Sequence, residues 1–128
     1  MSRTYIYQAD GVPAATSPIS HAVVCGETCH ISGQLSVYED GYRAGTAREE
    51  AARAFQLVFL IAEAAGFSRE EIVYVDIAFS DLERDLAAVN ELITELFSDY
   101  PARTIYEAKC LPFRAKVKVQ AIAIRVAK

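Results

Sequence analysis

The chain has 128 residues, of which 52% are hydrophobic and 23% are charged, and its formal net charge at pH 7 is −4. A chain of this length buries an ordinary hydrophobic core, so we expect residues 1–128 to form a single domain. The acidic balance disfavours nucleic acid as a partner, because a surface that binds nucleic acid requires clustered positive charge. The mean hydropathy of +0.14 is high for a small monomer and is consistent with apolar surface buried between subunits.

The sequence shows no membrane-spanning segment, no signal peptide and no metal-binding motif. The N-terminus lacks the apolar core of a signal peptide, and no later stretch is long enough to cross a bilayer. The three cysteines, an odd number, disfavour a disulfide framework. Cys25, Cys29 and His30 lack the spacing of a zinc site, and strand alternation places Cys29 and His30 on opposite faces. We therefore expect a cytoplasmic protein with no membrane contact, no metal and no cofactor.

The N-terminal third of the chain predicts three short strands. Residues 3–8 alternate in the way that is typical of a strand, and the segment that follows contains glycine and proline and is expected to be a loop. Residues 21–25 and 28–32 are rich in β-forming residues and are separated by Gly-Glu at 26–27, which predicts a tight hairpin. Residues 37–45 are expected to form a second loop.

Two amphipathic helices follow. Thr46, with Glu49 three residues later, is a capping box that opens the first helix, and Gly66 supplies its stop. Asp81 caps the second helix, which covers residues 82–98 and carries an apolar stripe.

The last quarter of the chain predicts two strands joined by a turn. Pro101 ends the second helix, and a strand runs from Arg103 to about Cys110. Pro112 marks a connection, because proline lacks the donor that a strand ladder needs. The residues after this turn alternate, and residues 121–124 are apolar on both faces, which predicts a strand in a sheet covered on both sides. We expect the two strands to pair as a buried closing hairpin with Arg103 at its start.

The predicted order of elements is β-β-β-α-β-α-β-β, with residues 72–80 as the strand between the two helices. The strand–helix–strand units require parallel crossovers, so the sheet is mixed, and both amphipathic helices lie on one of its faces. The sequence therefore predicts an α+β fold with two layers.

Several short motifs occur in order along the chain. They are Ser17-Pro18-Ile19-Ser20, Ile31-Ser32-Gly33-Gln34, Asp81, Asn90, Phe97, Pro101-Ala102-Arg103-Thr104, Leu111-Pro112 and Ala121-Ile122-Ala123. Together they extend over nearly the whole chain, and their order resembles that of the RidA (YjgF) family of enamine/imine deaminases. The resemblance implies a chorismate-mutase-like fold and a homotrimer with ligand clefts between its subunits.

The resemblance also implies roles for individual residues. Arg103 matches the arginine that holds the substrate carboxylate, for which a planar guanidinium fork is suited. Lys118 stands where the family's deaminases carry a glutamate that acts on the attacking water, so Arg103 and Lys118 are the candidate catalytic residues. The positions implied to contact the substrate are Arg103, Ser32, Gly33, Ile105, Leu86, Gln120 and Ile19, the last in place of the family's tyrosine.

Simpler roles remain open for both charged residues. Arg103 could cap the last carbonyls of the preceding helix or pair with a surface acid. In a symmetric closing hairpin, Lys118 would lie opposite Glu107 as a cross-strand charge pair worth about 0.2–1 kcal/mol. If it were instead desolvated, its pKa would fall, and it could act as a base or form a Schiff base.

We therefore expect a RidA-like small-molecule enzyme that acts on imine, enamine or related carboxylated metabolites, with Arg103 as the carboxylate anchor. Its acid/base chemistry is altered, because a protonated lysine at position 118 cannot act as a general base. The alternative is a non-catalytic trimeric binder or sensor of an anionic metabolite. Ribonuclease activity, which has been ascribed to relatives, is disfavoured by the acidic charge and the lack of a basic stripe.

Overall fold

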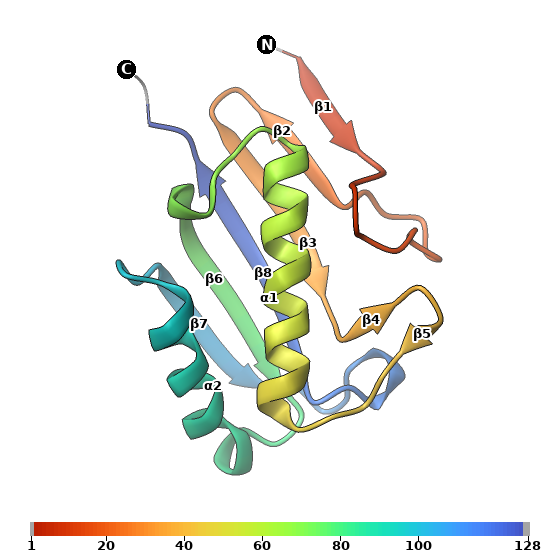
Figure 1. Cartoon of the computed structure of the whole chain (residues 1–128), viewed down its shortest axis with the longest axis vertical. Coiled ribbons are helices and arrows are strands. Elements are labelled where there is room, and N and C mark those ends of the chain that lie inside the picture. Colours follow the sequence, from red (N-terminus) through yellow and green to blue (C-terminus); the bar gives the residue numbers. More distant parts are fainter. Residues whose placement is uncertain (1, 127–128) are drawn as a thin grey trace.

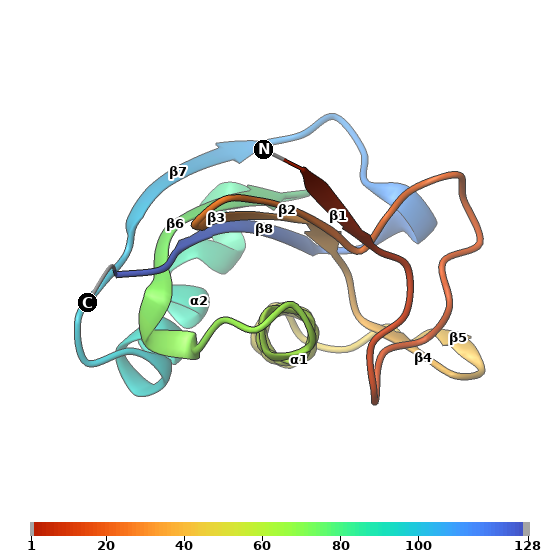
Figure 2. The same ribbon diagram turned by 90° about the horizontal axis from the view of Figure 1, so that it is seen from above.

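The computed structural model describes residues 2–126 and has two layers, a six-stranded sheet and two helices that cover one of its faces (Figures 1 and 2). Its elements are the strands β1 (Arg3–Ile6), β2 (Ala22–Cys25), β3 (Thr28–Gln34), β6 (Ile72–Phe79), β7 (Ala102–Glu107) and β8 (Val117–Ile124) and the helices α1 (Ala47–Ala64) and α2 (Leu82–Leu96). The strand order is β1-β2-β3-β8-β6-β7. The pair β6–β7 is parallel and the other pairs are antiparallel. The predicted α+β fold with a mixed sheet is confirmed.

Several short elements complete the fold. The segment after β3, predicted to be a loop, contains a two-stranded sheet of β4 (Val37–Tyr38) and β5 (Gly41–Tyr42). Two 3₁₀ turns, η1 (Arg69–Glu71) and η2 (Pro112–Arg114), precede β6 and β8. No helix within residues 2–126 is long and apolar enough to cross a membrane.

The helix boundaries follow the capping signals in the sequence. The N–H of Glu49 donates to Thr46 Oγ1 at 3.1 Å, and the N–H of Thr46 donates to Glu49 Oε1 at 2.8 Å, which closes the predicted capping box. Gly66 follows the end of α1 with a φ of +89°, a conformation that glycine adopts without steric cost. Asp81 accepts from the N–H of Arg84 at 3.1 Å and caps α2 as predicted.

The core lies between the helices and the sheet, and α1 packs directly over β8 and β3. Alternation along β8 decides which side chains enter the core. Val117 and Val119 are fully buried beneath the helices, whereas Lys118 and Gln120 point to the other face. Burying each large apolar side chain stabilises the fold by about 1.5–3 kcal/mol.

The predicted closing hairpin is wrong, because β7 and β8 are not neighbours. Strand β6 lies between them, and Ile77 of β6 pairs with Ile105 of β7 on one side and with Val119 of β8 on the other. The unit β6–α2–β7 is a parallel crossover, which places β7 at the sheet edge. β7 also ends at Glu107 rather than near Cys110, since the chain must pass the end of β6 to enter β8.

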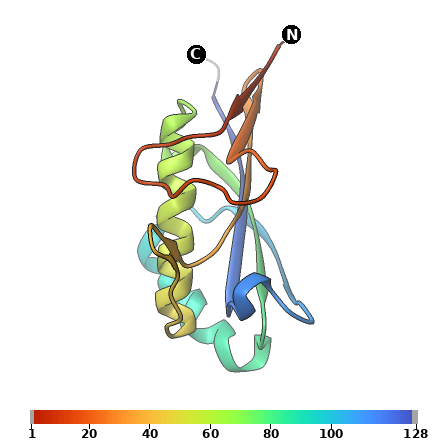
Figure 3. The same ribbon diagram turned by 90° about the vertical axis from the view of Figure 1, so that its right-hand side faces the viewer.

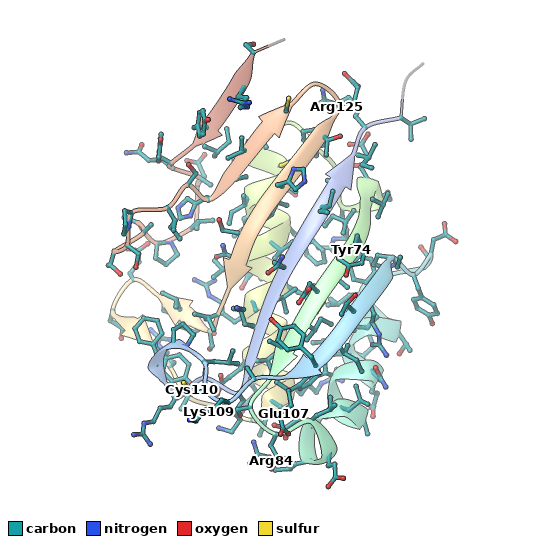
Figure 4. The ribbon with its side chains drawn as sticks, turned by 180° about the vertical axis from the view of Figure 1, so that it is seen from behind. Tyr74, Arg84, Glu107, Lys109, Cys110 and Arg125 are labelled. Atoms are coloured by element: carbon teal, nitrogen blue, oxygen red, sulfur yellow. The ribbon has the colours of Figure 1, made fainter. Side chains whose placement is uncertain are left out.

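The second face of the sheet carries no helix, as the edge-on view in Figure 3 shows. We call it the open face, and Figure 4 looks directly onto it, with Tyr74 of β6 labelled towards the β7 edge. Ile122 of β8 is half-buried and Ile124 is 42% exposed. The sheet was predicted to be covered on both sides here, and this is wrong for the single chain.

Candidate functional site

Arg103 lies on the edge strand β7 and faces helix α2. Its Nη1 donates to Oδ1 of Asn90 at 2.6 Å. Ile105 is on the same face of β7 and, like Leu86 of α2, packs against the core while remaining half-buried. These four residues, Arg103, Asn90, Leu86 and Ile105, form what we call the Arg103 half-site.

Neither simple role that was open for Arg103 matches its surroundings. Its side-chain partner is a neutral amide within α2 rather than a carbonyl at the end of that helix. No carboxylate in residues 2–126 lies within ion-pair distance of it. The guanidinium, on an exposed residue, is therefore oriented by one hydrogen bond and has no acidic partner among the described residues.

Lys118 lies on the open face and its side chain crosses Gly33. A Cβ added at Gly33 would lie 3.0 Å from Lys118 Cδ and 3.2 Å from its Cγ, so the glycine leaves room for the lysine. Lys118 pairs in register with Ala78 of β6. The alternative pairing with Glu107 does not form, since β6 separates the two strands and Glu107 Oε1 accepts from the N–H of Leu82 at 2.9 Å on the helix side.

The segment around Ser32 joins the Lys118 side of the sheet to the loop that carries Ile19. Ser32 Oγ donates to the carbonyl of Ser20 at 2.6 Å, and the N–H of Ser32 donates to the carbonyl of His21 at 2.9 Å. A register irregularity between β3 and β8 falls at this point of β3. Ile19, next to Ser20, is 48% exposed. We call Lys118, Gly33, Ser32, Gln120 and Ile19 the Lys118 half-site.

One chain does not bring the two half-sites together. Arg103 and Ile105 face the helices from the edge strand, whereas Lys118 and Gln120 face away from the helices in the middle of the sheet. The layer of the sheet and the whole of β6 separate them. The two candidate catalytic residues can therefore act on one small ligand only if a second chain contributes to the site.

Two polar features of the site region were missed from the sequence. Asn90 was part of the family motif, but its contact with Arg103 was not anticipated. On the open face, the hydroxyls of Tyr74 and Thr104 are hydrogen bonded to each other. Asp76 lies in register between Thr104 of β7 and Gln120 of β8, with its Oδ1 buried and without a partner in the described residues. The alternation along residues 72–79 placed Tyr74 and Asp76 on one face, but it could not show that this face is uncovered.

A buried carboxylate fixes the segments next to β8. Glu50 of α1 is fully buried and accepts from the hydroxyl of Tyr42 at 2.7 Å, from the N–H of Gly45 at 3.2 Å and from the N–H of Lys116 at 3.0 Å. Burial and the adjacent Glu50 carboxylate raise the pKa of Tyr42 to about 12. This network joins α1, the β4–β5 turn and the start of β8 into one rigid unit.

The histidine and cysteine residues of β3 are arranged as alternation predicted. Cys29 is fully buried on the helix side, and burial raises the pKa of its thiol to about 11. His30 is exposed on the open face. Within residues 2–126, no three His, Cys, Asp or Glu side chains are placed so that they could hold one metal ion.

Comparison with known proteins shows likeness over almost the full length of the chain. The family described as Endoribonuclease L-PSP matches residues 10–125. The 2-iminobutanoate/2-iminopropanoate deaminase of Capra hircus is 34% identical over 116 residues, which cover 88% of this chain and 84% of that protein. The RutC family protein y4sK of Sinorhizobium fredii is 35% identical over 113 residues, which cover 86% of this chain and 89% of that protein.

Solved structures give the same result. RidA from the Antarctic bacterium Psychrobacter sp. PAMC 21119 superposes with a TM-score of 0.88 at 33% identity, covering 95% of this chain and all of that one. TdcF of E. coli, solved with bound serine, superposes with a TM-score of 0.89 at 28% identity, covering 96% of this chain and all of that one. The family match, which covers residues 10–125, extends across both half-sites.

Proposed function

The chain belongs to the RidA (YjgF) family, which is also described as the Endoribonuclease L-PSP family, and from this premise we propose that it acts on imines, enamines or related carboxylated metabolites, with Arg103 as the carboxylate anchor. One observation carries the proposal: the guanidinium of Arg103 is oriented by the neutral oxygen of Asn90 at 2.6 Å and has no acidic partner in the described residues. A cation that is oriented but not neutralised is prepared to bind a carboxylate through two parallel hydrogen bonds.

The complete site, we propose further, forms between the subunits of a homotrimer. The Arg103 and Lys118 half-sites lie on opposite faces of the sheet, so they meet at one ligand only across an interface. Exposed apolar and aromatic side chains on the open face, such as Tyr106 and Ile124, would be buried by neighbouring subunits.

Cys29 and Cys110 are thiols rather than disulfides, which fits the cytoplasm as the proposed compartment.

The chemistry we propose for such a site is hydrolysis of a carbon–nitrogen double bond. The oxygen of water bonds to the imine carbon and one proton of that water moves to the nitrogen, which gives a carbinolamine. The hydroxyl proton then passes to the nitrogen as the carbon–oxygen double bond forms and the carbon–nitrogen bond breaks, which releases ammonia and a keto acid. Lys118, when protonated, cannot accept the proton of the water. Its ammonium instead stabilises negative charge on oxygen atoms of the ligand, while Gln120 orients the water.

The direct test is turnover of imines generated in solution from 2-aminoacrylate, with keto acid as the measured product. Arg103→Ala is expected to abolish turnover and to weaken carboxylate binding by about tenfold or more, since a charge-assisted bidentate contact is lost. Arg69→Ala, which removes the same charge from η1 outside both half-sites, is the matched control and should leave turnover unchanged. Turnover that survives Arg103→Ala would refute the proposed anchor.

The second candidate function is a non-catalytic binder of an anionic metabolite, and the ammonium of Lys118 favours it. Lys118 supplies positive charge where the family's deaminases carry an acid, and it has no ion-pair partner in residues 2–126. A binder would be stabilised against heat by dicarboxylates and would turn over no imine. Lys118→Glu distinguishes the two candidates, because restoring the acid should accelerate hydrolysis only in a cleft that is otherwise competent.

A further inference from the structure

A cavity on the helix side of the molecule lies outside both half-sites, and we infer that it binds a linear aliphatic polyamine. The cavity has a volume of about 780 Å³ and lies between the loop after β1, the C-terminal half of α1 and the β4–β5 turn. Figures 2 and 3 show the segment after β1 leaving the sheet and reaching the level of the helix layer, beside α1. No residue of either half-site lines this cavity. The inference is therefore independent of the proposed function.

The loop that closes the cavity is built against α1. The N–H of Val12 donates to the carbonyl of Ala9 at 3.0 Å, which forms a tight turn. Gly11 in this turn has a φ of +81°, and a Cβ added there would lie 3.3 Å from Leu60 Cδ1 of α1. A glycine at this position thus lets the loop approach the helix closely, so that the cavity wall is fixed by packing.

The charges around the cavity are all negative. Asp10 from the loop, Glu39 from the β4–β5 turn and Glu63 from α1 line it, and no lysine or arginine does. None of the three carboxylates forms an ion pair or a hydrogen bond with a residue in the described range. Three uncompensated carboxylates around one hollow attract positive charge.

A buried imidazole provides the second observation. His21 lines the cavity and is only 4% exposed, and its Nε2 has no hydrogen-bond partner within residues 2–126. Burial lowers the pKa of His21, so the ring is neutral and able to accept a hydrogen bond. Its backbone is fixed, because its N–H donates to the carbonyl of Ile6 at 2.8 Å and its carbonyl accepts from the N–H of Ser32. Nε2 itself has almost no accessible surface, so a ligand in the cavity contacts it only after a small movement of the ring, and the atom stays costly until it gains a partner.

The arrangement of these groups favours a chain-like cation over a metal ion. No three acidic, histidine or cysteine side chains in the described residues are close enough to hold one metal ion. The carboxylates belong to exposed residues of three separate segments, and the apolar residues Val12 and Leu60 line the same cavity. A linear polyamine matches this pattern, because its ammonium groups are separated by methylene segments that pack on apolar surface.

Isothermal titration calorimetry with spermidine at constant ionic strength tests the inference on the full chain. The wild-type protein is expected to bind saturably, and Glu39→Gln and Glu63→Gln are each expected to weaken binding by about two- to fivefold, with multiplying effects in the double variant. Glu83→Gln removes the same charge from the exposed face of α2 and is expected to leave the affinity unchanged. The absence of saturable binding, or an equal loss in Glu83→Gln, would overturn the inference.

Nuclear magnetic resonance of the two imidazole rings supplies a readout at the site itself. Spermidine is expected to shift the ring resonances of His21 and to leave those of His30, which lies on the open face, in place. His30→Gln assigns the two sets of signals without disturbing the buried ring. A shift of His30 alone, or full competition by Mg²⁺ at the same ionic strength, would show a general counterion effect and refute a polyamine site.

Discussion

On the helix-covered face of the sheet, side chains such as Ile77 and Phe79 are fully buried, whereas on the open face Ile124 is 42% exposed and Tyr106 is 39% exposed. The first face is completed by α1 and α2 of the same chain. The second face holds the Lys118 half-site and has no such cover. The difference teaches that a single chain supplies its own core but only part of the proposed site.

The same substitution on the two faces should give the largest contrast. Ile77→Ala removes a fully buried side chain and is expected to lower the free energy of unfolding by about 2–5 kcal/mol. Ile124→Ala is expected to cost less than about 1 kcal/mol in the monomer. Urea denaturation at low protein concentration measures both, and equal losses would contradict the division between the faces.

The polar network beneath α1 makes a smaller contribution to the helix-covered face. Tyr42→Phe removes the donor at 2.7 Å from the buried Glu50 and is expected to cost about 1–2 kcal/mol near neutral pH. Because the fold raises the pKa of Tyr42 to about 12 from its usual value near 10, this stabilisation is complete below about pH 10 and is lost as the pH rises towards 12.

The measurement is the difference in unfolding free energy between wild type and Tyr42→Phe from about pH 9 to about pH 12. That difference should shrink across this range, while contributions from the other tyrosines cancel. A difference that stays constant would show that the hydroxyl does not titrate against Glu50.

The smallest effect should come from the contact between Gly33 and Lys118 on the open face. Gly33→Ala is expected to cost less than about 1 kcal/mol, since the lysine side chain can move away from the added methyl. In the Lys118→Ala background the same change should be neutral, or stabilising by up to about 0.5 kcal/mol, because alanine loses less backbone entropy than glycine. Identical effects in both backgrounds would mean that the added methyl group does not meet the Lys118 side chain.

Local patterns predicted the elements well, because each element is decided by residues close together in the chain. The capping box at Thr46, the stop at Gly66 and the cap at Asp81 all lie where the sequence placed them. The β4–β5 pair was missed because two strands of two residues each leave no periodic signal.

The pairing of the strands could not be obtained from local patterns. Adjacent β-rich segments suggested a closing hairpin, but the crossover through α2 placed β7 at the edge and β8 in the middle of the sheet. The same error produced the alternative in which Lys118 pairs with Glu107, whereas its side chain lies against Gly33. The contact between Arg103 and Asn90 was not foreseen either, since it joins elements whose relative placement depends on the whole fold.

Subunit mixing between two inactive variants tests most directly whether the site is shared between chains. Arg103→Ala keeps the Lys118 half-site and Lys118→Ala keeps the Arg103 half-site, so each variant alone should bind or turn over little. Random 1:1 mixing of unfolded chains followed by refolding should restore about one quarter of the sites in a trimer, because each intact site needs one half from each variant. Mixed oligomers that show no recovery, or a protein that stays monomeric at every concentration, would contradict the account.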